Sequence, residues 1–339
     1  MRSFTINKND GGQRLDKFIS KATTGMPKSL MYKFIRTKKI KLNKKKAHEN
    51  DIVTEGDIID MYIPDEFFEK NKIDYTKATI IPEIVYEDEN IILVNKRPGV
   101  LVHTGDEGDL NRADADERET LIYTVTAYLV NKGEFDPEKE NSFAPALCNR
   151  IDRNTGGIVI AAKNAMTLKS VNEAIRENRV CKRYLAAVHG KLSGTAILCA
   201  YHRKDYKTNT VKITSKKVDG SKKIVTEYKA LSYNSELDIT LIEVRLITGR
   251  THQIRAHMAY IDHPLLGEGK YAKNKNDRKL GYKSQALYSS FVSFEFPEKE
   301  LAYLNGRIFA VDPASIGFLK LFKGFNIDSF FVQVNKKYR

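Results

Sequence analysis

The chain has 339 residues, of which 41% are hydrophobic and 10% aromatic, a composition that suits a folded protein of two ordinary domains. No apolar run approaches the roughly 20 residues that span a bilayer, and the N-terminus lacks the apolar core of a secretory signal. The cysteines Cys148, Cys181 and Cys199 form no close pair, which argues against a disulfide framework and a C-x-x-C metal site. We therefore expect a cytoplasmic, monomeric protein without a membrane partner.

Basic residues are concentrated near the N-terminus. Residues 1–50 hold 14 Lys and Arg but only three acidic residues, so they carry +11 of the formal net charge of +14. A basic surface can simply keep a protein soluble. An excess confined to one terminal module instead favours a nucleic-acid partner, whose phosphates it would neutralise.

Residues 1–64 are predicted to form this basic α/β module. In its second helix the apolar side chains share one face, whereas Lys33 and Arg36 lie on the opposite, polar face. Pro27 stands near the start of that helix, where proline is tolerated. The predicted elements are a helix that opens at Arg14, a helix over 28–38, a strand over 40–43, a basic turn over 44–46 and a strand over 57–63.

This arrangement resembles the S-four type RNA-binding module, which is named after a protein of the small ribosomal subunit. That family usually has a glycine in the turn after its second helix, where this chain has Lys38-Lys39. The resemblance implies that the module binds RNA phosphates and reads few bases. The residues expected to bind RNA are Arg14, Lys33, Arg36, Lys44, Lys45 and Lys46.

The charged stretch 65–80 is interpreted as a linker to a larger domain over 81–300. In that domain helices and strands mix irregularly, which predicts an α+β fold around a mostly antiparallel mixed sheet. Residues 301–339 are weakly patterned and form a C-terminal extension to which no role is assigned. The predicted strands are Ile91–Asn95, Gly157–Ala162, Tyr184–His189, Lys223–Leu231 and Leu237–Ile247, and the predicted helices are Leu121–Val130, Ala165–Arg176 and His252–Ile261.

Several motifs that would indicate other chemistry are missing from the sequence. It contains no G-x-x-x-x-G-K-[ST] loop, no G-x-G-x-x-G after a strand and no H-E-x-x-H. His252 and His257 are five residues apart, about 140° round a helix, so they do not converge on one metal ion. The expectation is a protein without a metal site or a cofactor.

A carboxylate between two arginines is the most distinctive feature of the chain. Asp152 lies in the run Asn149-Arg150-Ile151-Asp152-Arg153-Asn154-Thr155-Gly156-Gly157. Taken alone, such an aspartate is more often a salt-bridged turn residue than a catalytic one. A catalytic role for Asp152 is favoured only in combination with residues in other segments of the chain.

Two further segments supply these companions. Thr248–His257 leads from a strand into a helix, for which Thr251 is the predicted N-cap. Arg255 is placed in the first turn of that helix, off its buried face and free to reach a carboxylate. Tyr184 is placed within a strand, in the run Cys181-Lys182-Arg183-Tyr184.

Together these segments resemble the RluA type of pseudouridine synthase, and in particular the RluC and RluD enzymes of large-subunit ribosomal RNA. The family signature is His-Arg-Leu-Asp, two variable residues and Thr-Ser-Gly, so Asn149, Ile151 and Gly156 depart from it while Asp152 is kept. The resemblance covers about residues 84–296. The other matching segments are Tyr86-Glu87-Asp88-Glu89, Asn95-Lys96-Arg97-Pro98-Gly99, Thr248–Arg255 and His263-Pro264-Leu265-Leu266-Gly267.

The resemblance implies a role for each matching residue. Asp152 becomes the catalytic carboxylate, Arg255 the cation that keeps it ionised, and Tyr184 the residue that packs against the target base. Arg150 matches the arginine that fills the gap left when the base leaves the RNA stack, and Leu287 matches an apolar wall of the pocket, although Tyr288 follows it where the family usually has His. Thr155 and Arg250 complete the expected substrate-binding residues.

The expected activity is therefore the isomerisation of uridine to pseudouridine in structured RNA. The expected substrate is 23S-type ribosomal RNA, with transfer RNA as the alternative. A non-catalytic RNA-binding ribosome assembly factor is a rival class, which would be favoured if Asp152 lacked Tyr184 and Arg255. A glycoside hydrolase is another rival, but it needs two opposed acids, and no second carboxylate matches Asp152.

Overall fold

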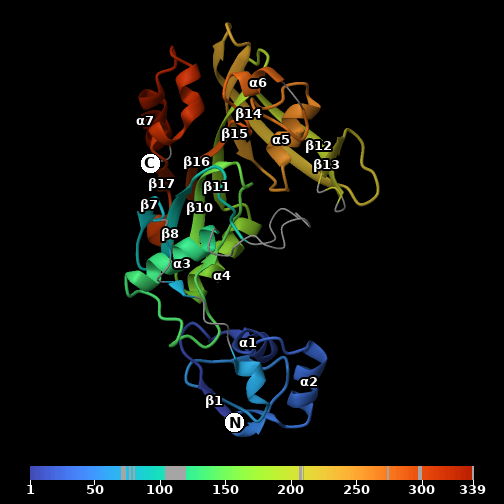
Figure 1. The fold of residues 1–339 in the computed structure, drawn as a ribbon, viewed down its shortest axis with the longest axis vertical. Helices are drawn as coiled ribbons and strands as arrows, with labels where there is room; N and C mark the ends of the chain where they lie inside the picture. Colours follow the sequence, from blue (N-terminus) through green and yellow to red (C-terminus); the bar gives the residue numbers. More distant parts are fainter. Residues whose placement is uncertain are drawn as a thin grey trace. The chain divides into compact units, whose positions relative to one another are not determined.

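The computed structural model describes residues 1–69, 74, 75, 78, 81–103, 120–205, 208, 210–272, 275–296 and 300–337. The chain divides into two compact units (Figure 1). Unit 1 contains residues 1–81, 123–146 and 162–169, and unit 2 contains residues 82–122, 147–161 and 170–339. Within the described ranges, no helix combines the length and the hydrophobicity needed to cross a membrane.

Unit 1 contains a small sheet covered by two short helices. Its strands are hydrogen-bonded in the order β1-β6-β3-β4. The helices α1 and α2 bury their apolar faces with the sheet, and Phe18, Ile35 and Ile59 lie in the resulting hydrophobic cluster. The elements are β1 (Arg2–Thr5), β2 (Gln13–Arg14), α1 (Leu15–Ala22), α2 (Lys28–Arg36), β3 (Ile40–Leu42), β4 (Lys45–Lys46), β5 (Ile52–Val53), β6 (Ile58–Met61) and the 3-10 helix η1 (Asp65–Phe68).

Two basic segments of unit 1 adopt left-handed backbone conformations. Lys38, in the turn after α2, has φ of 60°. This left-handed conformation favours glycine, the residue that the S-four type module usually has in this turn. Asn43 and Lys44 have φ of 50° and 63° and form the two-residue connection of a hairpin between β3 and β4. The predicted basic turn over 44–46 is therefore wrong in its extent, because Lys45 and Lys46 already belong to β4.

A buried carboxylate joins distant segments of unit 1. Asp10 is fully buried and accepts hydrogen bonds from Asn141 Nδ2 at 2.7 Å and from Ser142 Oγ at 2.6 Å. Asn7 and Asn9 donate to the carboxylate of Glu140 at 3.1 and 2.8 Å. Unit 1 is consequently held together by polar contacts that span more than 130 positions of the chain.

Unit 2 is built on one large mixed sheet. The strand order is β13-β12-β14-β15-β11-β16-β10-β8-β7, with β17 paired to β16 and β9 paired to β10. The pair β10 and β16 is parallel, whereas β11 is antiparallel to both β15 and β16. The expected α+β fold with a mostly antiparallel sheet is confirmed. Its strands are β7 (Ile84–Glu87), β8 (Ile91–Lys96), β9 (Ala146–Leu147), β10 (Gly156–Ala162), β11 (Val180–His189), β12 (Thr195–Asp205), β13 (Thr210–Thr214), β14 (Lys222–Asn234), β15 (Ile239–Leu246), β16 (Leu287–Phe294) and β17 (Ile308–Ala310).

Three helices of this part of the chain agree with the predicted ones to within a few residues, namely α3 (Leu121–Asn131), α4 (Ala165–Arg176) and α5 (Gln253–Tyr260). The helices α6 (Lys275–Lys279) and α7 (Ile327–Lys337) and the 3-10 helices η4 (Ala302–Leu304), η5 (Pro313–Ser315) and η6 (Gly317–Leu321) were not predicted. Helix α5 packs against β12, β13 and β14 (Figure 1). This packing brings Arg255 to the sheet that also carries Tyr184.

The C-terminal segment packs into the hydrophobic core of unit 2. Strand β17 pairs with β16, and Phe318, Phe322 and Phe331 are buried in the same cluster as Phe291. The ring of Phe331 lies 4.6 Å from that of Phe291, measured between centroids. Residues after 300 therefore cover the strand whose first residue, Leu287, lines the pocket described below.

Candidate active site

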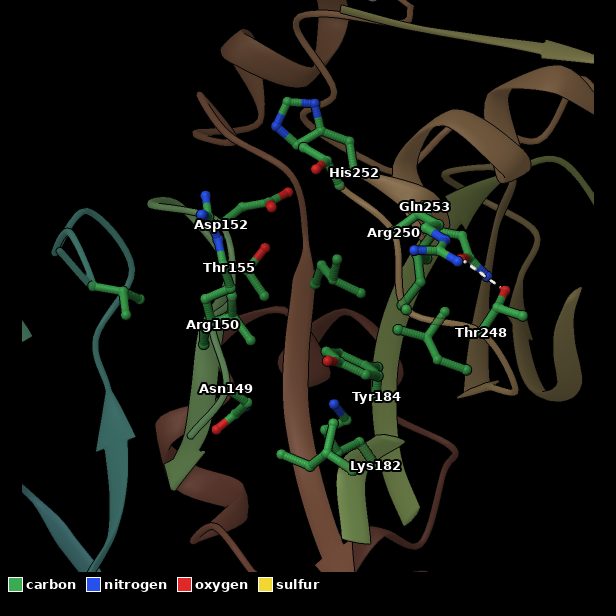
Figure 2. Close-up of a pocket in the computed structure, with 18 of the residues that line it drawn as sticks. Asn149, Arg150, Asp152, Thr155, Lys182, Tyr184, Thr248, Arg250, His252 and Gln253 are labelled. Carbon is green, nitrogen blue, oxygen red and sulfur yellow. Dashed lines mark hydrogen bonds between the residues drawn. The ribbon is translucent and has the colours of Figure 1, made fainter. Parts of the chain in front are cut away.

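Unit 2 contains a cavity of about 670 Å³ that is lined by three segments of the predicted motifs. The first is the loop that includes Asp152, the second is the first half of β11, and the third is the turn before α5 (Figure 2). The volume lies within the usual range for small-molecule sites in proteins. The predicted residues Arg150, Asp152, Thr155, Tyr184, Arg250, Arg255 and Leu287 all line this cavity.

The loop that carries Asp152 connects β9 to β10. The backbone N–H of Thr155 donates to the Asp152 carbonyl at 3.0 Å, which closes a tight turn. Gly157 follows with φ of 112°, and a Cβ there would lie 2.2 Å from the Ser289 carbonyl oxygen of β16. Only glycine allows this close approach of β10 to β16. The turn and the tight strand pair together fix where Asp152 projects.

Gly156 is required for a different reason, the close approach of the Tyr288 ring. A Cβ at Gly156 would lie 2.3 Å from Cε2 of the Tyr288 ring. Tyr288 is buried, and its hydroxyl donates to Asn95 Oδ1 at 2.8 Å. The two departures from the resembling family, Gly156 and Tyr288, are therefore in direct contact, and the larger ring occupies the space that a serine side chain would need.

A buried lysine supports the same loop from β8. Lys96 is 1% exposed, and its ammonium group donates to the carbonyls of Arg97, Val100 and Arg153 at 3.1, 2.9 and 2.8 Å. Gly99 and Arg153 are also joined by a backbone hydrogen bond at 2.9 Å. These contacts anchor Arg153, the residue that follows Asp152. The loop is therefore held by β8 as well as by the turn at Thr155 and the pairing of Gly157 with β16.

Arg255 forms the predicted pair with Asp152. Its Nη1 donates to Asp152 Oδ2 at 3.1 Å, while its Nε and Nη2 donate to Glu268 at 2.8 and 2.9 Å. Burial alone would raise the pKa of Glu268, but the hydrogen bonds and charge of Arg255 outweigh it and lower that pKa. Burial would lower the pKa of Arg255, yet the two carboxylates raise it, so the guanidinium stays charged.

Two details of the predicted helix are wrong. Arg255 is only 8% exposed, because α5 is buried on all sides from Gln253 to Met258, and it reaches Asp152 from within the core. Thr251 is not the N-cap: the helix begins after His252, which has φ of 53° and makes no side-chain cap. A left-handed histidine at this point turns the chain sharply from the pocket wall into α5.

Hydrogen bonds between buried side chains hold this turn. Thr248 Oγ1 donates to Gln253 Oε1 at 3.0 Å, and Gln253 Nε2 donates to Thr226 Oγ1 at 3.0 Å (Figure 2 shows the first contact). Thr226 Oγ1 lies 2.9 Å from His257 Nδ1. Since Thr226 already accepts from Gln253, we assign its proton to this contact and a neutral ring to His257. Burial lowers the pKa of His257 to about 4, in agreement with that assignment.

His252 lines the pocket beside the ion pair, and Tyr271 contacts it. His252 Nδ1 lies 2.6 Å from the Tyr271 hydroxyl, and the Tyr271 ring lies 5.6 Å from the Arg255 guanidinium carbon. Burial lowers the pKa of His252 to about 4, so the ring is neutral at physiological pH. The charged groups that lie closest to this neutral ring are consequently Asp152 and Arg255, with Glu268 behind Arg255.

Tyr184 lies on β11, with its side chain in the cavity (Figure 2). It is 6% exposed, and burial raises the pKa of its hydroxyl to about 12. The phenol therefore remains protonated at physiological pH, and its ring offers an apolar surface for a planar base. Leu287 adds an apolar wall, and Thr155 Oγ1 accepts a hydrogen bond from Gln285 Nε2 at 3.2 Å.

The remaining predicted cations differ in their surroundings. Arg150 and Arg250 are exposed at the cavity, and the guanidinium group of Arg250 makes no hydrogen bond or ion pair with any residue that the structure describes. In unit 1, Lys33, Arg36, Lys44, Lys45 and Lys46 are all exposed. Arg14 differs from these because its guanidinium donates to Asp16 at 3.0 and 2.7 Å, which offsets its charge locally.

Glu268, Tyr271, Asn149 and Lys182 are among the residues of the site that were given no role from the sequence. Glu268 follows the matching segment His263–Gly267 directly, so its position in the sequence was the available signal. Tyr271 lies three residues further on. Asn149 and Lys182 were part of the quoted segments but were given no role, although both line the cavity.

The similarity to known proteins agrees with this geometry. Residues 90–260 match the family model described as RNA pseudouridylate synthase. An uncharacterized RNA pseudouridine synthase of Mycoplasma genitalium is 34% identical over 88% of this chain and 90% of its own length. The chain belongs to the RNA pseudouridylate synthase family.

Further relatives share this family. The ribosomal large subunit pseudouridine synthase C of Buchnera aphidicola subsp. Acyrthosiphon pisum is 30% identical over 92% of this chain and 94% of its own length. Among solved structures, human RNA pseudouridylate synthase domain containing 4 is 20% identical, with a TM-score of 0.52 over 71% of this chain and 93% of its own. That likeness supports the fold alone.

Proposed function

We propose that this protein isomerises uridine to pseudouridine in large-subunit ribosomal RNA, with Asp152 as the catalytic carboxylate. The observation that carries the proposal is the contact of 3.1 Å between Asp152 and the buried Arg255 in a pocket whose wall includes Tyr184. The hydrogen bond from this fixed cation orients the partly exposed carboxylate toward the cavity. The side chain of Asp152 is 21% exposed, so a substrate can reach it.

The reaction is an isomerisation without net loss or gain of atoms. The bond between N1 of uracil and C1′ of the ribose breaks, the uracil turns, and C5 forms the new bond to C1′. C5 then loses its proton, and N1 gains one. Asp152 can act as nucleophile toward the sugar or the ring, or as a base on the sugar, and each of these roles requires its ionised form.

The other residues orient the substrate. Tyr184 offers its ring face to the uracil, and its protonated hydroxyl can take part in the proton transfer from C5. Leu287 supplies an apolar wall. The target nucleotide must leave the RNA stack at a cost of a few kcal/mol, and the exposed Arg150 is suited to fill the gap that it leaves. Thr155 and Arg250 bind the flipped nucleotide at the cavity.

Ribosomal RNA is favoured as the substrate because relatives that match most of this chain are named ribosomal large subunit pseudouridine synthases. We assign RNA binding to the excess of cations in residues 1–50, because a module of S-four type over residues 1–64 would bind phosphates and contribute affinity. Transfer RNA is the alternative substrate. The protein acts in the cytoplasm as a monomer.

The decisive experiment compares pseudouridine in ribosomal and transfer RNA from a strain with the gene and a strain without it. A site that loses its modification identifies the target. Restoring the gene should restore that site, whereas restoring an Asp152→Asn version should not. If no RNA loses pseudouridine, or if the Asp152→Asn version restores it, the proposal is wrong.

A further inference from the structure

The cavity extends along β11 beyond Tyr184, away from the ion pair. There it is lined by Asn149 from the loop before β10 and by Lys182 from β11 (Figure 2). Neither the Asp152–Arg255 pair nor the hydrogen bonds that hold the loop involve the Lys182 ammonium group or the Asn149 Nδ2 group. This end of the cavity is therefore built but unused by the contacts described so far.

The amide of Asn149 has one satisfied and one unsatisfied end. Its Oδ1 accepts a hydrogen bond from the backbone N–H of Ile160 at 2.7 Å, which fixes the orientation of the amide. Its Nδ2 is buried and has no partner among the residues that the structure describes. A buried donor without a partner costs about 1–3 kcal/mol. Such a group in a native protein calls for an explanation, and one that lines a cavity can be satisfied by a bound ligand.

Lys182 presents a second unused donor. It lies two residues before Tyr184 on the same face of β11, and its ammonium group forms no hydrogen bond or ion pair within the described ranges of the chain. Burial lowers the pKa of its ammonium group. A lysine that could extend into solvent would keep its water shell, so a partly buried and unpaired amine in a cavity indicates a missing acceptor.

The two donors restrict what this end of the cavity can hold. The amide NH₂ and the ammonium group only donate, so their ligand must present acceptor oxygens. Alternate residues of a strand are roughly 6.5–7 Å apart, about the width of a pyrimidine. A uracil packed on Tyr184 can therefore extend its far edge, with the C4 carbonyl, toward Lys182.

We propose that Asn149 and Lys182 form the part of the pocket that recognises the C4 carbonyl of the target uracil and excludes cytosine. Cytosine carries an amino group at the same carbon. That amino group is a hydrogen-bond donor, so it could not pair with the donors of Asn149 and Lys182, and all three groups would lack an acceptor. A site built on buried hydrogen bonds discriminates strongly for this reason. The inference rests on the proposed function, since it identifies the base that reacts beside Asp152.

Two variants change one donor each and keep the local contacts. Lys182→Met retains the length of the side chain without its amine. Asn149→Asp retains the acceptor for the Ile160 N–H and replaces only the unpaired NH₂. Lys229→Met is the matched control, because Lys229 is an exposed lysine on strand β14 outside the cavity. Thermal unfolding of each variant establishes that it is folded.

The assay measures tritium release from C5 of the target nucleotide in RNA that contains either uridine or 4-thiouridine, whose sulfur is a weaker acceptor. Wild type should prefer uridine. Lys182→Met and Asn149→Asp should lose about 10–100-fold in kcat/KM with uridine and much less with 4-thiouridine, as expected for the loss of one hydrogen bond. Lys229→Met should match wild type with both RNAs.

Salt-titrated binding separates a base contact from a phosphate contact. If Lys182 bound a phosphate, Lys182→Met would reduce the slope of log affinity against log salt by about 0.7. A reduced slope, or variants that match wild type with uridine, would overturn the assignment. If wild-type protein releases no tritium at all, the proposed function fails instead, and the two failures are distinguishable.

Discussion

Glu268 binds two of the three guanidinium nitrogens of Arg255, at 2.8 and 2.9 Å, and leaves Nη1 to face Asp152 at 3.1 Å. The side chain of Glu268 is 1% exposed, so this bidentate pair lies in the protein interior. A forked contact fixes both the position and the rotation of a guanidinium group. Asp152 is therefore aligned indirectly by a carboxylate that does not line the cavity.

The first prediction concerns this alignment. Glu268→Gln removes the charge and one acceptor, so Arg255 should lose its fixed rotation and point less accurately at Asp152. We expect turnover to fall about 10–100-fold with little change in KM, since a shift of about 1 Å can cost 10²-fold. Single-turnover tritium release measures this effect.

The ion pair between Glu243 on β15 and Arg183 on β11 provides a matched control for Glu268→Gln. Glu243 accepts a hydrogen bond from Arg183 at 3.0 Å, and this partly buried ion pair lies outside the cavity. Glu243→Gln should lower the stability to urea but leave turnover unchanged. Equal losses of activity in both variants would mean that Glu268 acts only through general stability.

The second prediction concerns the carboxylate itself. Asp152→Asn keeps the shape of the side chain and its contact with Arg255 but removes the negative charge. Turnover should fall by at least ~10⁴, while RNA binding stays within a few-fold of wild type. Residual activity within tenfold of wild type would exclude Asp152 as the catalytic group.

The third prediction concerns acid stability. Burial lowers the pKa of His252 and His257 to about 4, below the value of 6.5 expected in the unfolded chain. The unfolded state therefore binds more protons between pH 6.5 and 4, so the stabilisation is present above pH 6.5 and is lost as the pH falls toward 4. For the fully buried His257 the loss at pH 4.5 should be on the order of 2 kcal/mol.

Urea unfolding at pH 7 and pH 4.5 measures this loss. His257→Asn can keep the contact with Thr226 Oγ1 through its side-chain oxygen and does not titrate. This variant should show a smaller difference between the two pH values than wild type. An equal difference would assign the acid sensitivity to other groups.

The fourth prediction concerns the contact between Gly156 and Tyr288. Gly156→Ser places a Cβ against a ring carbon only 2.3 Å away, so we expect a destabilisation of about 1–3 kcal/mol. Tyr288→His alone should also destabilise, because the hydrogen bond to Asn95 is lost. The double variant should be more stable than the sum of both effects predicts. Additive effects in urea unfolding would show that the two positions are independent.

The fifth prediction separates RNA affinity from chemistry. Lys33 and Arg36 are exposed on α2, so Lys33→Ala/Arg36→Ala should bind all RNAs more weakly, with a salt slope shallower by about 1.5. Turnover at saturating RNA should stay close to wild type. Lys320→Ala/Lys323→Ala removes two exposed cations of the C-terminal segment and serves as the control. An unchanged slope in the first variant would mean that this face is only solvated.

The sequence allowed the residues of the cavity to be predicted where short motifs coincide with local structure. Asp152, Arg255 and Tyr184 line one cavity, as expected. Glu268 was not predicted, since its role depends on a loop that returns to Arg255 in space. Asn149 and Lys182 were overlooked for a related reason: an unsatisfied donor becomes visible only when the surrounding atoms are known.

The missed strands have their own physical explanations. Strand β12 (Thr195–Asp205) contains the apolar run Ala196–Tyr201, but most of that run is exposed or only partly buried, so the strand is defined by its pairing with β13 and β14 rather than by a local pattern. Strand β16 is buried along nearly its whole length, but its pairing partners β10 and β11 precede it by more than 90 residues. Neither that pairing nor the packing of Phe318 and Phe331 after residue 300 follows from local pattern.

The parallel pairing of β10 with β16 also sets the order of events during synthesis. Gly157 pairs with Ser289, so 132 residues must be synthesised after Gly157 before β10, which follows the loop of Asp152, can pair with β16. Synthesis of these residues at about 5–20 residues per second takes roughly 7–26 s. Until then the edge of the apolar strand β10 that pairs with β16 has no hydrogen-bonding partner. A nascent chain that has not reached residue 289 lacks the backbone pairing beside the loop of Asp152, so the wall of the cavity is complete only in the nearly finished polypeptide.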